Sequence, residues 1–308
     1  MCGRATLTVP AEDVARIFEV DPIDIGPPRF NLAPTQPILT VRAVRAASQN
    51  PAASQSPGSA CVRRELALMR WGLIPWWAKP DEAKRIASRC IQARAESVAR
   101  APAFRDAFQR HRCLVVVDGF FEWKTLPDGR RVPHVVRVAR PADGAHRAAP
   151  GEPGNAIELA RSSPFAIAAV WDTWRPPSPE GVPTEAERPE RIESCAVLTT
   201  RSGGVVREIH DRMPLILGPD EWDAWLGGGI EDARRVLEQS QDAVERRASN
   251  LVATPVSTWV NDVRHDDPTC IEPLALEPGV ATAEGAQGAF QFAASPAAPR
   301  TRSRRRRA

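Results

Sequence analysis

The hydrophobic and polar positions of the chain alternate over many short stretches, and only a few segments have a helical period. Alternation and short apolar runs are typical of strands. They predict strands at residues 38–44, 61–70, 113–118, 119–124, 132–138, 165–171, 192–200 and 251–256. Apolar residues at helical spacing predict helices at residues 10–18, 95–109, 219–226 and 230–244.

The connections between these elements differ in composition. A Pro-rich segment at 21–37 predicts an ordered loop, and 71–79 predicts an aromatic loop. Pro127, Asp128 and Gly129 predict the tight turn of a hairpin that joins the strands on either side. Three polar insertions lie at residues 46–60, 141–163 and 174–190.

Many short strands with few helices indicate the α+β fold class, with one domain and a mixed sheet, because alternating βαβ units are missing. After about residue 278 the composition shifts to Ala, Gly, Pro, Ser and Arg. Such a composition buries too little apolar surface to fold. We therefore expect one domain at residues 1–278 and a disordered basic tail at 279–308.

Composition places the chain among globular proteins. It has 308 residues, of which 43% are hydrophobic, with 30 Pro and no Tyr. No apolar run approaches the roughly 20 residues that cross a membrane. The first residues lack a basic region followed by an apolar core, which a signal peptide requires. We expect a cytoplasmic protein with reduced thiols and no membrane partner.

The cysteines and histidines give no metal-binding pattern. None of the six Cys forms a C-x-x-C pair, and the five His do not cluster with them. A structural zinc site or a disulfide framework is therefore not expected, and neither is another cofactor. Cys90, Cys113 and Cys195 are expected to be small buried residues.

The net charge is concentrated at the end of the chain. It is +3 in total, but six arginines lie in the last nine residues, so the rest carries about −3. Nucleic-acid binding by the folded part would need a local basic groove. The run at 304–307 either adds non-specific DNA affinity or is a solvated tail end, and the sequence leaves both open.

Cys2 offers chemistry that no internal cysteine can perform. Removal of Met1 would leave Cys2 with a free α-amine and a thiol on adjacent carbons. This 1,2-aminothiol can attack one carbonyl carbon twice, first with nitrogen and then with sulfur. The alternative is that Cys2 is an ordinary second residue, and its position alone does not decide between the two.

Five further stretches combine polar, aromatic and catalytic residue types. They occur in order at residues 29–36 (RFNLAPTQ), 69–79 (MRWGLIPWWAK), 92–97 (QARAES), 112–124 (RCLVVVDGFFEWK) and 209–217 (IHDRMPLIL). With Met1-Cys-Gly-Arg in front, this set resembles the SOS-response-associated peptidase (SRAP) family, and the matching segments run to about residue 274. Each motif is weak alone, whereas the ordered set is specific.

The resemblance implies one SRAP-like domain with a bifurcated, barrel-like mixed β-sheet core flanked by helices. It also implies a monomer whose N-terminal Cys2 removes its own Met1. Cys2 would then form a thiazolidine crosslink with the ring-opened sugar of an abasic site in single-stranded DNA. The lesion would thereby be shielded during the DNA-damage response.

Three more residues take catalytic positions by the resemblance. Glu122 lies where the family has its active-site glutamate, and apolar neighbours would raise its pKa by desolvation. His210 matches the family histidine, which can give or take a proton. Gln92 departs from the family asparagine, and its amide lies one methylene further out. The alternatives are an outward-facing Glu122 and a structural His210.

DNA contacts are expected from arginines and aromatic residues in the motifs. Arg4, Arg94 and Arg212 suit backbone phosphates. The alternative is that they pair with Glu96 or Asp118.

Trp77 is expected to stack on a base, and Trp71 to belong to the core. Asn31 and Pro34 are expected to line the same cleft, together with Thr35.

Two other functions remain open from the sequence. An N-terminal-nucleophile peptidase or amidotransferase also begins with Cys-Gly. A non-covalent single-strand DNA-binding module would result if Gln92 disables the chemistry.

Overall fold

The computed structural model describes residues 3–44, 62–139, 163–176 and 191–274. The chain up to Pro273 forms one compact unit. The three predicted insertions lie largely outside the described residues. The predicted domain boundary at 278 and the predicted tail lie entirely outside them and stay predictions.

The core is a closed barrel of five strands. In order around the barrel these are β10 (Ile192–Arg201), β4 (Arg64–Trp71), β3 (Pro37–Ala43), β6 (Arg112–Val117) and β9 (Phe165–Trp174), and β9 pairs back onto β10. Three short strands extend this sheet: β5 (Gln92–Arg94) and β11 (Arg212–Pro214) on β10, and β12 (Ile216–Leu217) on β9. The barrel-like core and the α+β class expected from the sequence are confirmed.

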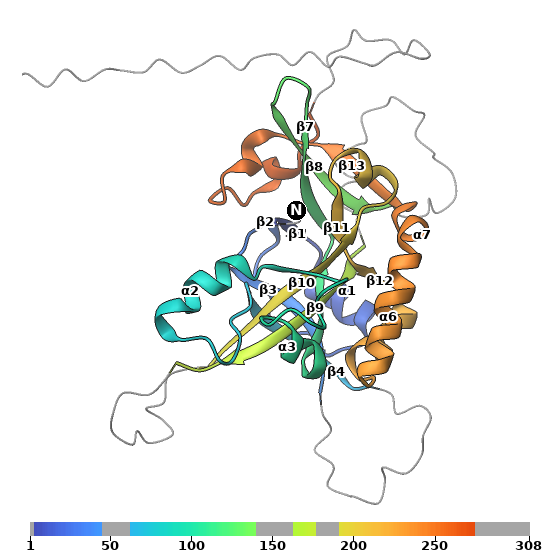
Figure 1. Cartoon of the computed structure of the whole chain (residues 1–308). Coiled ribbons are helices and arrows are strands. Elements are labelled where there is room, and N and C mark those ends of the chain that lie inside the picture. The colour runs from blue at the N-terminus through green and yellow to red at the C-terminus, as the bar shows by residue number, and fades with distance from the viewer. Residues whose placement is uncertain (1–2, 45–61, 140–162, 177–190, 275–308) are drawn as a thin grey trace, which may run out of the picture. The chain divides into compact units, whose positions relative to one another are not determined.

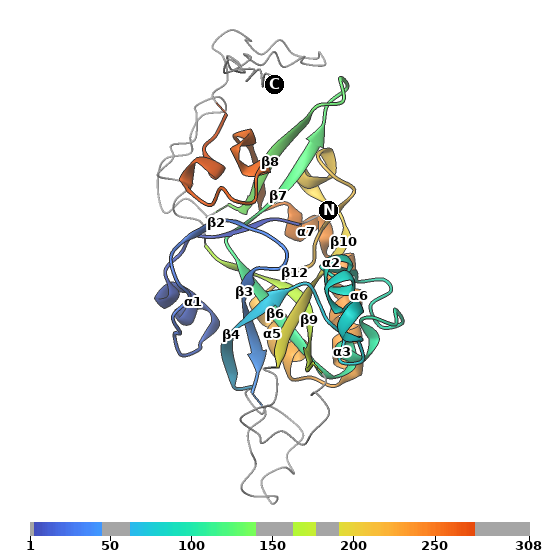
Figure 2. The ribbon, with the colours of Figure 1, turned by 90° about the vertical axis from the view of Figure 1, so that its left-hand side faces the viewer.

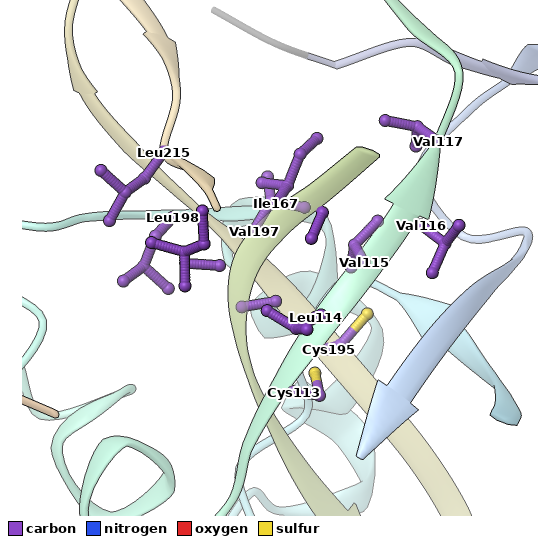
Figure 3. Packing of buried hydrophobic residues seen from close by; sticks show 14 of the residues in the cluster. Cys113, Leu114, Val115, Val116, Val117, Ile167, Cys195, Val197, Leu198 and Leu215 are labelled. Carbon is purple, nitrogen blue, oxygen red and sulfur yellow. The ribbon is translucent and has the colours of Figure 1, made fainter. Parts of the chain in front are cut away.

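The barrel is filled by the apolar runs that predicted its strands. All six residues of β6 are buried, and Leu114 and Val115 belong to the same hydrophobic core as Ile167 of β9 and Val197 and Leu198 of β10 (Figure 3). The Cys113 and Cys195 side chains also lie in this core as free thiols. Burial raises the pKa of Cys195 to about 12, so this thiol stays protonated.

A second sheet of five strands is open. Its order is β13 (Leu251–Pro255), β8 (Arg131–Val138), β7 (Gly119–Thr125), β1 (Ala5–Leu7) and β2 (Arg29–Leu32). The chain passes from the barrel into this sheet at Asp118, the one residue between β6 and β7. The predicted turn joins β7 and β8 into a hairpin that extends away from the barrel (Figures 1 and 2).

The helices cover the barrel. They are α1 (Ala11–Phe18), α2 (Pro80–Arg89), α3 (Arg105–Arg110), α5 (Pro219–Leu226), α6 (Ile230–Asp242) and α7 (Val244–Ala248). The short 3₁₀ segments are η3 (Gly204–Glu208), η4 (Thr258–Asn261) and η5 (Pro268–Ile271). Phe18 of α1 stacks on Trp222 of α5 with ring centroids 4.5 Å apart. Within the described residues, no helix is both long and apolar enough to cross a membrane.

Three local predictions were wrong. The helix expected at 95–109 is a series of turns followed by the short α3, because Pro102 cannot continue a helix and disfavours helical geometry at the residue before it. Helix α2 was missed, although Pro80 takes the first helical position, where proline is favoured. The segment at 21–37 contains strand β2, which pairs with β1.

Candidate active site at the β7–β8 hairpin

The start of the described chain lies against β7. Ala5 of β1 is paired with Phe120 in an antiparallel register, and the Phe121 amide donates a 3.0 Å hydrogen bond to the Arg4 carbonyl. Gly3 and Arg4 therefore approach the segment that carries Glu122. Met1 and Cys2 lie outside the described residues, so the prediction for Cys2 stays untested.

Asp118 fixes strand β1 in this place. Its carboxylate is fully buried and accepts hydrogen bonds from the Thr6 hydroxyl at 2.5 Å, the Thr8 amide at 2.7 Å and the Thr8 hydroxyl at 2.5 Å. The next residue is Gly119, where a Cβ would lie only 2.7 Å from the Thr6 hydroxyl oxygen. The close approach of β1 to β7 therefore depends on both Asp118 and Gly119.

Glu122 is a fully buried carboxyl in the middle of β7. Burial raises its pKa above the ordinary value, and the positive charges of His210 and Arg131 oppose this shift. A raised pKa widens the pH range in which the carboxyl holds a proton that it can donate in a reaction. Glu122 is not the outward-facing strand residue that the sequence left open.

His210 follows η3 and is partly buried, with 22% of its side chain exposed. The Arg212 amide donates to its Nδ1 at 3.0 Å, while the Asp211 Oδ1 lies 2.7 Å from the same nitrogen. The first contact needs an unprotonated Nδ1, and the second needs a protonated one. His210 therefore has a partner for Nδ1 in either protonation state, which suits a residue that exchanges protons.

Gln92 and Arg94 lie on β5, opposite Val197 and Thr199 of β10. Residue 92 is partly buried, whereas Arg94 is exposed. Arg94 is therefore available to an anionic ligand.

Arg212 is paired within the protein. Its Nη1 and Nη2 donate to the two carboxylate oxygens of Glu96 at 2.7 and 3.0 Å, and Nη2 also donates to the Thr199 carbonyl at 2.6 Å. Burial acts to raise the Glu96 pKa, but the Arg212 hydrogen bonds, a backbone hydrogen bond and the charges of Arg212 and Arg94 together lower that pKa below its ordinary value. The Arg212 charge is thus compensated, and this is the ion pair that the sequence left open.

Arg4 and Asn31 hold the segment around η4. The Arg4 Nη1 donates to the Asn31 Oδ1 and the Val260 carbonyl, both at 2.7 Å. Asn31 is fully buried, and its Nδ2 donates to the carbonyls of Val260, Asp262 and His265. The Asn31 amide is fully occupied inside the protein, so any part it plays in DNA binding acts through the loop it holds.

Asp266 covers the neighbouring strand β2. Its Oδ1 accepts from the amides of Phe30 and Asn31 at 2.6 and 2.8 Å, and its Oδ2 accepts from the Arg29 Nε at 2.5 Å. The segment after η4 is thereby joined to β2 by its side chain and not by a strand.

Pro34 and Thr35 form a strained turn beside β4. Thr35 has φ +79°, a left-handed conformation that is rare for a β-branched residue. Its amide donates to the Trp71 carbonyl at 2.7 Å, and its carbonyl accepts from Arg70 at 3.1 Å. These contacts to β4 hold the strained conformation.

The backbone of the aromatic loop is held by buried side chains, while two of its tryptophan side chains are exposed. Trp76 and Trp77 have 58% and 43% of their surface exposed, whereas Trp71 is buried, as expected. The Trp76 amide donates to the buried carboxylate of Asp172 at 2.9 Å, and the Ile74 amide donates to the Ser194 hydroxyl at 2.8 Å. Trp77 is thus presented to solvent by a fixed backbone.

The comparison with known families now gives the assignment. Residues 1–263 match the family described as SOS response associated peptidase (SRAP). The chain belongs to the SRAP family. The resemblance seen in the sequence motifs is confirmed.

Curated relatives of this SRAP chain carry names that describe a DNA lesion. It is 31% identical over 277 residues to the abasic site processing protein YoqW of Bacillus subtilis (strain 168), a match that covers 88% of this chain and 99% of that protein. It is 30% identical over 215 residues to the abasic site processing protein HMCES of Gallus gallus, covering 69% of this chain and 59% of that protein.

Solved structures share the fold. A Bacteroides thetaiotaomicron protein aligns with a TM-score of 0.63 at 19% identity, covering 89% of this chain and all of that one. A Bordetella bronchiseptica protein aligns with a TM-score of 0.58 at 22% identity, covering 83% of this chain and all of that one. At these identities the similarity shows a shared fold and nothing about function.

Sequence reasoning missed one titratable residue paired with Glu122. His134 of β8 lies directly opposite Glu122 of β7. The signal was present, because counting outward from the predicted hairpin turn pairs these two positions. Among residues 3–44, 62–139, 163–176 and 191–274, no three His, Cys, Asp or Glu side chains form a group that could hold a metal ion.

Proposed function

We propose that this SRAP protein binds single-stranded DNA and forms a covalent thiazolidine crosslink with abasic sites through Cys2. The observation that carries the proposal is the pairing of β1 with β7. This pairing brings the start of the chain toward the buried, protonatable Glu122. Both curated relatives are named abasic site processing proteins, and these names support an abasic site as the DNA lesion that is bound.

The reaction needs Met1 to be removed first, by the protein itself. The free α-amine of Cys2 then adds to the C1′ aldehyde of the ring-opened sugar and gives a carbinolamine. Loss of water from the carbinolamine gives an imine. The Cys2 sulfur adds to the imine carbon, its proton moves to the nitrogen, and a five-membered thiazolidine results. One water is released, and no oxidant or metal is required by this balance.

Glu122 and His210 would manage the protons of these steps. The carboxyl of Glu122 donates a proton to the departing hydroxyl of the carbinolamine, because burial favours its protonated form. His210 accepts or returns a proton at Nδ1, where either state has a partner. Gln92 contributes an amide hydrogen bond to the nucleophile or the sugar.

The DNA strand would be held by charge and by stacking. Exposed Arg94 contacts a phosphate directly, and Arg4 adds positive charge near the lesion. Arg212 contacts a phosphate only when its ion pair with Glu96 opens. Trp77 offers an exposed aromatic face to a base beside the abasic gap. The turn at Pro34 and the loop held by Asn31 would border the bound strand.

The decisive experiment is incubation with a single-stranded oligonucleotide that contains one abasic site, followed by a denaturing gel. A shifted band is expected with the wild type and not with Cys2→Ser. Intact mass of the purified protein should show the loss of Met1. Absence of the band in a protein that lacks Met1 would overturn the proposal.

Two controls separate the other functions. Non-covalent binding of the same oligonucleotide on a native gel, without a band on the denaturing gel, would indicate a binding module only. Ammonia release from glutamine would indicate an amidotransferase, and the proposal predicts none.

A further inference from the structure

Two titratable side chains lie opposite one another on the β7–β8 hairpin. Glu122 of β7 and His134 of β8 are direct partners in an antiparallel ladder. Directly opposed residues point to the same face, with Cβ atoms about 5 Å apart. On this face the next pair toward the barrel is Phe120 and Val136, both fully buried in the main core. The side chains of His134 and Glu122 therefore project from the same face of the hairpin at adjacent positions.

The His134 ring has a defined tautomer. Its Nδ1 lies 3.0 Å from the Val132 carbonyl oxygen. A carbonyl can only accept, so Nδ1 carries the hydrogen, and in the neutral ring Nε2 has the free lone pair. Burial lowers the pKa of His134, the hydrogen bond to Val132 opposes this shift in part, and the charge of Lys124 adds to it. The ring is therefore neutral at neutral pH.

The position of His134 differs from that of Glu122 in access to solvent. Glu122 is fully buried, whereas His134 is only partly buried. In the sheet, His134 is paired with Glu122 on β7 and with Pro255 on β13, and the charge of Lys124 on β7 also acts on its ring. Lys124 repels the imidazolium form, and a Glu122 carboxylate attracts it. Protonation of His134 is thus favoured just when Glu122 has lost its proton.

We propose that His134 acts through Glu122, as a residue that returns a proton to the Glu122 carboxylate. Its Nε2 takes up a proton from solvent or buffer and passes it to the Glu122 carboxylate. Glu122 then donates this proton to the leaving hydroxyl of the carbinolamine, and His134 returns to the neutral ring with Nδ1 still bonded to Val132. One proton enters from solvent and one leaves in the released water. This step rests on the proposed function, since it supplies the acid that imine formation needs.

The first test is the rate of crosslink formation. His134→Ala should slow it about tenfold while DNA binding stays unchanged. Added imidazole should restore the rate in proportion to its protonated fraction. Pyrazole has the same ring shape but is a far weaker base, so it should not restore the rate. His111→Ala is the matched control, because His111 stacks on Trp171 of the barrel and should not affect the rate.

The outcomes are distinguishable. No crosslink with wild-type protein means that the proposed function is wrong. A normal wild-type rate with an unchanged His134→Ala rate overturns the relay, and so does equal rescue by imidazole and pyrazole. If His134→Ala fails to fold in a thermal melt, His134→Gln keeps the bulk and is compared in its place.

The second test needs no DNA. An NMR titration of the histidine rings should show a different His134 titration curve in Glu122→Gln from that in the wild type, because protonation of each member of a coupled pair depends on the other. The His111 titration should not change. An unchanged His134 titration would show that the two groups are not coupled and would contradict the proposal, whatever the crosslinking assay gives.

Discussion

Strands β6 and β7 follow one another in the chain with only Asp118 between them, and yet they belong to different sheets. Strand β6 lies in the closed barrel between β3 and β9, and all six of its residues are buried. Strand β7 lies in the open sheet, is buried from Gly119 to Glu122, and becomes more exposed from Trp123 onward. Both strands are buried where they leave the junction, but only β7 buries an acidic side chain.

The difference separates stability from chemistry. Each aliphatic side chain buried in β6 contributes about 1.5–3 kcal/mol relative to exposure. A buried carboxyl in β7 has the opposite effect, since the protein favours its neutral form and shifts its pKa upward. The apolar core of the barrel thus stabilises the folded unit and offsets the unfavourable burial of the Glu122 carboxyl. Four variants test this division, in order of decreasing expected effect.

Removing core volume from the barrel should have the largest effect. Leu114→Ala should lower the free energy of unfolding by about 3 kcal/mol, because Leu114 is fully buried in β6. Urea unfolding at pH 7 measures the loss. The rate of crosslinking per folded molecule should not change. The control is Val252→Ala on β13, where the side chain is half exposed and the change should stay within about 0.5 kcal/mol.

Glu122→Gln should slow crosslinking about a hundredfold, because glutamine keeps the shape and loses the proton. It should also stabilise the fold in a pH-dependent way. A raised folded-state pKa means that the wild type loses stability as the pH rises from about 4.5 through that raised value. The variant does not titrate, so its advantage in melting temperature should grow from pH 4.5 to pH 8.

The matched control for that variant is Glu238→Gln on α6, an exposed carboxyl whose replacement should give no pH-dependent difference. A constant difference in melting temperature between Glu122→Gln and the wild type would contradict the assignment of a buried, protonatable Glu122.

Asp118→Asn tests the junction between the two strands. An amide in place of the carboxylate cannot accept at both positions, so one donor of Thr6 or Thr8 is left unsatisfied at a cost of about 1–2 kcal/mol. Hydrogen exchange of the Phe121 amide should become faster, since β1 is held less firmly. Asp128→Asn in the exposed turn of the same hairpin serves as the control. Unchanged exchange at Phe121 would show that β1 does not depend on Asp118.

Gln92→Asn should have the smallest effect. It restores the family amide at the same place on β5, and crosslinking should stay equal or rise by up to about threefold. A quenched time course on the abasic oligonucleotide measures it, with Gln109→Asn on α3 as the control. A marked loss of rate would mean that the longer amide is adapted to this chain.

The sequence predicted most strands because their burial follows the apolar pattern. Residues 113–118 read as one buried strand, and Gly119 to Lys124 read as its continuation. The pattern could not show that the sheet changes at Asp118, because closure of the barrel depends on which distant strands pair. The helix predicted at 95–109 failed because the apolar spacing was given more weight than Pro102.

Side-chain partners in the site were less predictable than its residues. The motifs predicted Glu122, His210 and Arg212 as site residues without knowledge of the fold. They could not decide that Arg212 pairs with Glu96 or that Asn31 is occupied inside the protein, since these contacts join segments far apart in the chain. His134 could have been found from the hairpin register alone.

The carboxylate of Asp266 also protects an edge of the open sheet against aggregation. Strand β2 ends the order of the open sheet, and the backbone of such an outer strand can template pairing with another chain and so lead to aggregation. Asp266 occupies the amides of Phe30 and Asn31 with a negatively charged group that no incoming strand can extend. Pairing of another chain with this edge is therefore opposed by one acidic side chain that is remote in sequence from β2.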